Sequence, residues 1–312
     1  MEDFWFVVFE HLTSPRDFRE LGLSSKAAYS KLQIHKDKLR NSRHLERLLR
    51  MFPDKPWNYI YLSQNPGVTW DYVQQHPELQ WNYDNLSRNP NVTWDIVQEN
   101  QSLPWNYDYL SRNPNVTWDI VQQNFSLWNY DYLSMNPSIT WDIVQKNPSL
   151  PWNYSNLSRN PNITWDIVQQ NPDVRWDYGY LSINPCVTWD IVQQNQTLPW
   201  NYFVLSQNPN ITLDIVQQNL GLEWPNEWFA FNPNVTWDTV KQNPNINWDY
   251  NFLSENPNIT WDIIQQNPDF GGCERGISLN PNLTWSIIVE NPDFKWNWEL
   301  LSYNTFGVKR SN

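Results

Sequence analysis

The residue types that perform catalysis are present in this chain, but their spacing does not assemble them into a reactive site. No two of the histidines have the spacing of a metal-binding motif; they are His11, His35, His44 and His76. The 8 glycines form no phosphate-binding loop. A carboxylate does recur at regular intervals, as in Trp94-Asp95, where it suits the first turn of a helix better than acid–base chemistry. We therefore expect a protein that is not an enzyme and that holds no cofactor and no metal.

Two further patterns suggest modification or cross-linking, and both have a structural interpretation that we prefer. Cys186 and Cys273 lie far apart in the repeat frame and show no disulfide or zinc spacing, which favours a reducing compartment. Triplets such as Asn91-Val92-Thr93 match glycosylation acceptors, but each threonine stands where a helix N-cap belongs. No basic segment precedes the apolar stretch 4–9, so we expect a cytoplasmic protein that is not secreted.

The candidate binding residues are positions that vary inside an otherwise repeated pattern. Varied side chains at the fourth, fifth and eighth places of a 24-residue unit should align along one ridge of the array, as extended binding surfaces of repeat proteins do. The ridge changes from basic to apolar along the chain, and clustered exposed aromatic residues are typical of partner sites. The candidates are Arg88, Arg112, Met135, Arg159, Ile183, Phe203, Trp228, Phe231 and Phe252. The alternative is that these positions have drifted without selection. The pairs Asp84–Arg88 and Asp108–Arg112 could then be exposed ion pairs one helical turn apart.

The element that must position these residues is a repeat with the consensus Trp-Asn-Tyr-x-x-Leu-Ser-x-Asn-Pro-Asn-Val-Thr-Trp-Asp-Ile-Val-Gln-Gln-Asn-Pro. Its copies start 24 residues apart, as from Trp57 to Trp81, with one interval of 23 residues from Trp105 to Trp128. The copy at Gly272 has lost its leading tryptophan. A fixed period of this length indicates a stacked array of units.

Each unit predicts two short helices. In the unit from Trp81 to Pro104, Asn82 caps the first helix and Asn89-Pro90 ends it, whereas Thr93 caps the second. Two prolines per unit and the lack of alternation exclude strands. Helices this short are stable only when they pack on neighbours, so we expect an all-α solenoid of about ten units, shaped as a curved or superhelical rod.

Composition limits the partners. The net charge is −12, which argues against nucleic acid and against an anionic membrane surface. The 22 tryptophans stand almost entirely at two places of the repeat, so we interpret them as packing elements.

Residues 1–56 lack the repeat. We expect helices from Asp17 to Leu23, from Ser25 to Leu32 and from His44 to Met51, the last a linking helix with an apolar side of Leu45, Leu48 and Leu49. This segment would cap the first unit. Residues 304–312 read as a polar tail.

Two parts of the chain resemble known families. The order Pro15-x-Asp17-Phe18, Leu21-x-Leu23, Ser25-Lys26 and Tyr29 resembles an F-box. The resemblance implies binding to a Skp-type ubiquitin-ligase adaptor through Val8, Leu12, Pro15, Phe18 and Leu21. The repeats, over 57–303, resemble the Asn/Trp-rich tandem repeats of large DNA viruses of amoebae, which would place the protein in the host cytoplasm.

The sequence thus predicts an F-box-like domain and linker over 1–56 and a solenoid over 57–303. The preferred hypothesis is an adaptor that recruits an unknown target protein for ubiquitination. The alternatives are a structural or assembly protein of a virus, with residues 1–56 only as a cap, and a drifted copy without a fixed partner.

Overall fold

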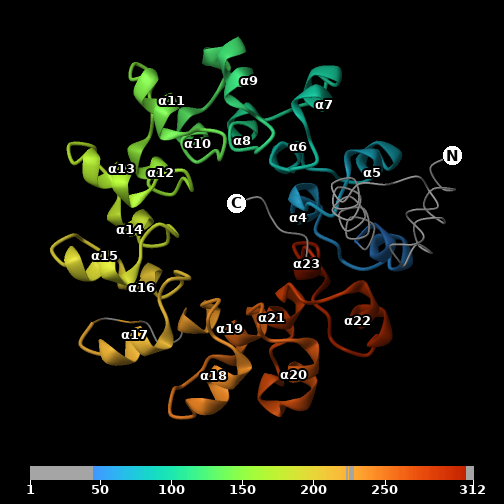
Figure 1. The fold of residues 1–312 in the computed structure, drawn as a ribbon. Coiled ribbons are helices and arrows are strands. Elements are labelled where there is room, and N and C mark those ends of the chain that lie inside the picture. Colours follow the sequence, from blue (N-terminus) through green and yellow to red (C-terminus); the bar gives the residue numbers. More distant parts are fainter. Residues whose placement is uncertain (1–44, 223, 225–227, 307–312) are drawn as a thin grey trace, which may run out of the picture.

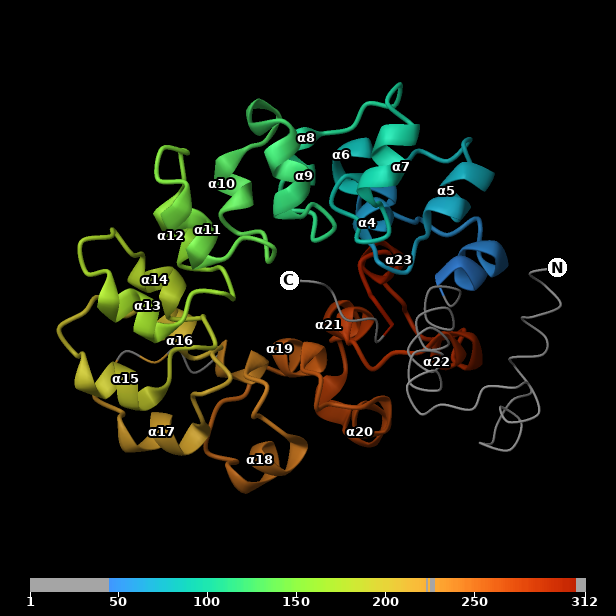
Figure 2. The same cartoon turned by 45° about the horizontal axis from the view of Figure 1, so that its top comes forward.

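A computed structural model describes residues 45–222, 224 and 228–306. Over these residues the chain is all-α, and its short helices lie in two concentric circles that form a ring (Figure 1). The first and last inner helices lie side by side in both views (Figures 1 and 2). Among the described residues no helix is both long and apolar enough to span a membrane.

Each unit contributes one inner and one outer segment. The inner segments are α4 (Tyr59–Gln64), α6 (Tyr83–Leu86), α8 (Tyr107–Leu110), α10 (Tyr130–Leu133), α12 (Tyr154–Leu157), α14 (Tyr178–Leu181), α16 (Tyr202–Leu205), the 3₁₀ helix η2 (Trp228–Phe231), α19 (Tyr250–Glu255), α21 (Glu274–Leu279) and α23 (Trp298–Leu301). The outer helices are α5 (Trp70–Gln75), α7 (Trp94–Glu99), α9 (Trp118–Gln123), α11 (Trp141–Lys146), α13 (Trp165–Gln170), α15 (Trp189–Gln194), α17 (Leu213–Gln218), α18 (Trp237–Gln242), α20 (Trp261–Gln266) and α22 (Trp285–Glu290). Two 3₁₀ turns, η1 (Phe125–Leu127) and η3 (Pro268–Phe270), follow α9 and α20.

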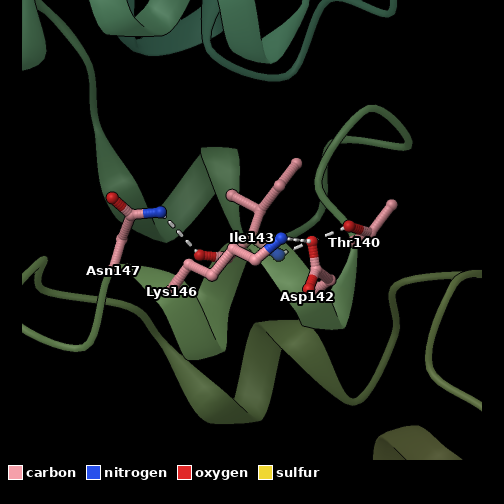
Figure 3. Close-up of polar contacts among 5 residues, drawn as sticks. All are labelled: Thr140, Asp142, Ile143, Lys146 and Asn147. Atoms are coloured by element: carbon pink, nitrogen blue, oxygen red, sulfur yellow. Dashed lines mark hydrogen bonds and ion pairs between the residues drawn. The ribbon is translucent and has the colours of Figure 1, made fainter.

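Side-chain caps start the helices at the places that the sequence predicts. Asn82 caps α6 by accepting a hydrogen bond from the Asn85 amide, and Thr93 caps α7 by accepting one from Ile96. Figure 3 shows the outer helix α11, where the Thr140 hydroxyl accepts from the Ile143 amide at 3.4 Å. At its other end the Asn147 side chain donates to the Ile143 carbonyl at 2.8 Å. Both ends of a helix of 6 residues are therefore satisfied by its own sequence.

The leading tryptophan of each unit wedges between neighbouring segments. Trp152 is buried, packs on Trp118 and Tyr130 at 5.9 and 5.3 Å, and donates from Nε1 to the Asn147 carbonyl at 2.9 Å. Burial of such a side chain stabilises the fold by roughly 1.5–3 kcal/mol. In the unit that lacks its leading tryptophan, Phe270 fills the same place against Trp237 and Tyr250.

A buried asparagine joins each inner segment to the one before it. Asn160 shows the pattern: its Nδ2 donates to the carbonyls of Ser134, Asn136 and Ile139 in the preceding unit at 3.0–3.2 Å. Its Oδ1 accepts from the Asn162 amide. Within the described residues this asparagine recurs in eleven units, at Asn65, Asn89, Asn113, Asn136, Asn160, Asn184, Asn208, Asn232, Asn256, Asn280 and Asn304.

The same contacts close the array on itself. Asn65 of the first unit donates to the carbonyls of Ser302 and Asn304 in the last unit, at 2.8 and 2.9 Å. The Asn58 amide donates to the Ser302 hydroxyl, as the Asn82 amide does to Ser63 one unit later. We refer to this first-to-last interface as the seam.

The last unit takes its outer helix, the eleventh among the described residues, from the N-terminal side of the array. Residues 45–51 are helical and bury Leu45, Leu48 and Leu49, the predicted apolar side. The turn after this helix accepts the Trp57 Nε1 hydrogen bond at the Phe52 carbonyl, as the turn after α11 does for Trp152. Arg47 lies over the ring of Trp285, 6.0 Å from its centroid. The last unit therefore combines α23 with the helix over 45–51.

This closure corrects two expectations. The array is a ring and not a rod, because its first unit pairs with its last unit. The ring also extends beyond the expected bounds of 57 and 303, since residues 45–51 form an outer helix and Asn304 and Phe306 are buried. The period of 24 residues does not specify the rotation from one unit to the next, and this rotation brings the ends of the array together.

Candidate functional site

The fifth and eighth places of the inner segments contact each other around the inside of the ring. The eighth side chain of one unit lies against the fifth side chain of the next. Arg88 lies over Tyr109, Arg159 lies over Tyr180, and Phe231 packs on Phe252 at 4.7 Å. The seam continues the series with Tyr303 on Tyr61 at 5.5 Å. We call these fifth- and eighth-place side chains the inner surface.

The inner surface has a basic arc. The guanidinium carbon of Arg88 lies 3.6 Å from the centroid of the Tyr109 ring, and that of Arg159 lies 4.6 Å from Tyr180. Such cation–π contacts fix the plane of a guanidinium and leave its outer N–H groups free to donate. Arg88 Nε is buried and has no hydrogen-bond partner among the described residues.

Asp84–Arg88 and Asp108–Arg112, the ion pairs considered under the alternative of drift, do not form between described residues. Asp84 accepts a hydrogen bond from the Asn106 side chain of the next unit at 2.8 Å, and Asp131 accepts one from Asn153 at 2.7 Å. The ion pairs seen over the described ranges involve His76, Lys146 and Lys241, not the inner arginines. The aspartates thus help to join units, while the arginines remain without a described carboxylate.

Arg112 interacts electrostatically with both of the other arginines. Its pKa is lowered, first because the surrounding protein removes water and then because the positive charges of Arg88 and Arg159 oppose its own. The side chain is itself reached by solvent, so this loss of water comes from the ring wall around it. Tyr303, at the seam, acts in the opposite direction on the Arg112 pKa. An interaction with a residue across the seam places the Arg112 guanidinium toward the inside of the ring.

The later units give the inner side an apolar arc. Ile183, at an eighth place, is 37% exposed, while Phe231 and Phe252 are half-buried against each other. Phe203, at the fourth place of its unit, is 41% exposed. Met135, between the basic residues of neighbouring units, is also half-buried. The change from basic to apolar that the sequence shows is therefore a change around one ring.

Several predicted residues lie outside the described part of the chain. The candidate adaptor-binding residues Val8, Leu12, Pro15, Phe18 and Leu21 fall in 1–44. Trp228 begins η2, and its side chain is likewise outside the described residues.

Sequence reasoning missed the tyrosines of the inner surface. Tyr61, Tyr109, Tyr132, Tyr180 and Tyr303 contact one another or the arginines, and Tyr109 packs on Tyr132 at 5.9 Å. The available signal was the frequent tyrosine at the fifth place, which pairs with an arginine at the eighth place of the unit before.

Away from the inner surface, the described residues offer little chemistry. No cluster of three metal-binding side chains occurs in the described ranges. Burial raises the pKa of the Cys186 thiol to about 11, which makes it a poor nucleophile near neutral pH. The outer aspartates, such as Asp95 and Asp119, are exposed in the first turns of their helices.

Comparison of the chain with protein-family models, with curated proteins and with solved structures finds no match.

Proposed function

We propose that this protein is a non-catalytic receptor, in which the inner surface holds a target and residues 1–44 dock a Skp-type ubiquitin-ligase adaptor. The observation that carries the proposal is that repeated and varied positions have different roles within each unit. Positions that repeat without change, such as Asn160 and Trp152, build the wall and the unit interfaces. Positions that vary, such as Arg159 and Ile183, lie on the inner side.

Closure of the ring favours this role over that of an assembly element. An open solenoid offers two unpaired ends to which further copies can add. Here the first unit pairs with the last through Asn65 and Ser302, so the described residues leave no repeat interface free for such growth.

The adaptor part is tested by a binding titration of the intact chain with a purified Skp-type adaptor from an amoeba host. The test variant is Pro15→Ala/Phe18→Asp/Leu21→Asp, and the control is Lys146→Gln/Lys241→Gln on the outer helices. Stoichiometric binding by the parent and the control, lost in the test variant, is the expected result. A folded parent chain that does not bind the adaptor would overturn the adaptor role and leave the assembly hypothesis first.

A further inference from the structure

The basic arc is unusual because the chain as a whole is acidic. The net charge is −12, yet Arg88, Arg112 and Arg159 lie on one side of the ring without a described carboxylate partner. The positive charges of Arg88 and Arg159 add to the loss of water in lowering the pKa of Arg112. Like charges held together in this way destabilise the free protein, and an anion placed between them would remove that cost.

The arginines are also preorganised. Two of the three lie over tyrosine rings, and the Nε of Arg88 is buried. A guanidinium held by its face presents its edge to the ligand, and the edge is the part that forms paired hydrogen bonds with oxyanions. Less side-chain entropy is lost on binding when these orientations already exist.

We propose that Arg88, Arg112 and Arg159 form a binding site on the inner surface for a ligand with clustered phosphate groups. A phosphate group carries up to two negative charges and three acceptor oxygens, so a compact cluster can engage three guanidinium groups at once. A single carboxylate has one charge and two oxygens, which leaves the arc unsatisfied. The exposed Ile183, at an eighth place, lies on the neighbouring arc, and Phe203 is exposed in the unit after it, so apolar groups attached to the phosphates would find contact there.

This site uses the inner surface to which the proposed function assigns the target, but it does not depend on residues 1–44. Clustered phosphate has two sources, a free polyphosphate compound or a phosphorylated segment of another protein. The site serves both, and the experiment separates them.

The test measures binding to the purified full chain without any adaptor protein. The probes are inositol hexakisphosphate, by calorimetry, and an immobilised pool of degenerate peptides with two fixed phosphoserines, by interferometry, with the unphosphorylated pool beside it. The test variant is Arg88→Gln/Arg112→Gln/Arg159→Gln. The matched control, Lys146→Gln/Arg175→Gln/Lys241→Gln, removes the same positive charge from exposed sites elsewhere on the chain. Far-UV circular dichroism and the unfolding midpoint establish that both variants fold.

We expect saturable binding of at least one phosphate probe, weakened at least about 100-fold in the test variant and less than about threefold in the control. A preference for the peptide pool, reduced further by Ile183→Ser/Phe203→Ser, identifies a protein segment as the ligand. Equal affinity for inositol hexakisphosphate, unaffected by those two changes, identifies a free polyphosphate. Absence of binding to every probe, or equal losses in the test variant and the control, would overturn the proposal.

Discussion

Asn65 and Ser302 stand 237 residues apart in the chain and share a hydrogen bond of 2.8 Å, from the asparagine Nδ2 to the serine carbonyl. The equivalent bond from Asn89 to Ser63 joins neighbouring units at 2.9 Å. The seam is therefore built from the same contacts as the interfaces within the chain, but α23 directly follows neither the helix over 45–51 nor α4 in the chain, so only non-covalent contacts hold it there.

That difference predicts that a defect at the seam opens the ring, whereas the same defect elsewhere does not. Asn65→Asp removes the donor and places a carboxylate against two carbonyl oxygens, and Asn160→Asp does the same inside the array. We expect small-angle X-ray scattering to show a larger radius of gyration only for Asn65→Asp. Asn160→Asp should lower the unfolding midpoint while the ring stays closed. Identical scattering curves for the two variants would contradict a seam held by these contacts.

The buried asparagines should contribute more to the free energy of unfolding than exposed residues of the same unit. Asn113→Ala removes one donor each from the carbonyls of Ser87, Asn89 and Val92, and among the described residues only Asn89 and Val92 keep another donor, from the Val92 amide and the Asn115 side chain. We expect a loss of at least about 2 kcal/mol in the free energy of unfolding. The control is Asp108→Ala, an exposed change that should cost less than about 0.5 kcal/mol. Urea denaturation measures both. Equal values would show that the asparagine bonds only replace hydrogen bonds to water.

The short 23-residue interval before Trp128 has a local consequence. With one residue fewer in the preceding turn, the Trp128 Nε1 is buried without a partner, whereas Trp152 donates to the Asn147 carbonyl. Trp152→Phe should therefore destabilise the protein by about 1 kcal/mol more than Trp128→Phe, because only the former loses a hydrogen bond. Chemical denaturation of the two variants makes the comparison, and a larger loss at Trp128 would refute this explanation.

Alkaline pH should unfold the ring partly through Tyr72. Burial, and then the negative charge of Glu46, raise the pKa of this phenol from 10.0 to about 12. The unfolded chain releases the proton near pH 10 but the folded chain retains it, so the stabilisation is complete below pH 10 and is lost as pH rises to about 12. Tyr72→Phe should flatten the decline of unfolding free energy between these values, relative to the parent chain. An unchanged slope would mean that Tyr72 ionises as easily in the folded state.

The helices and their caps could be predicted from the sequence because their signals are local. Asn82 and Thr93 stand at the predicted caps, and the apolar side of the helix over 45–51 was visible as Leu45, Leu48 and Leu49. Asn89 was recognised only as a helix terminator. Its bonds to the previous unit depend on a stacking geometry that no single unit specifies.

Closure was not predicted, although one sequence signal pointed to it. Phe52-Pro53-Asp54-Lys55-Pro56-Trp57 matches the turn Asn147-Pro148-Ser149-Leu150-Pro151-Trp152, so the repeat begins before its first complete copy. The missing half of the last unit is supplied by this early segment. The inner surface was anticipated as a set of varied positions. Its pairing of arginine with tyrosine across units required the ring to be seen.

A closed ring also restricts which changes in the number of repeat units the protein can accept. Duplication or loss of a whole 24-residue unit leaves an open solenoid intact, but here it would alter the rotation needed to bring Asn65 against Ser302. Removal of the single residue before Trp128 is tolerated, because it shortens a peripheral turn and leaves the buried bonds of Asn136 to Ser111 and Asn113 in place. Ring closure therefore restricts the number of repeat units. Substitutions on the inner surface are the remaining route to a new binding specificity.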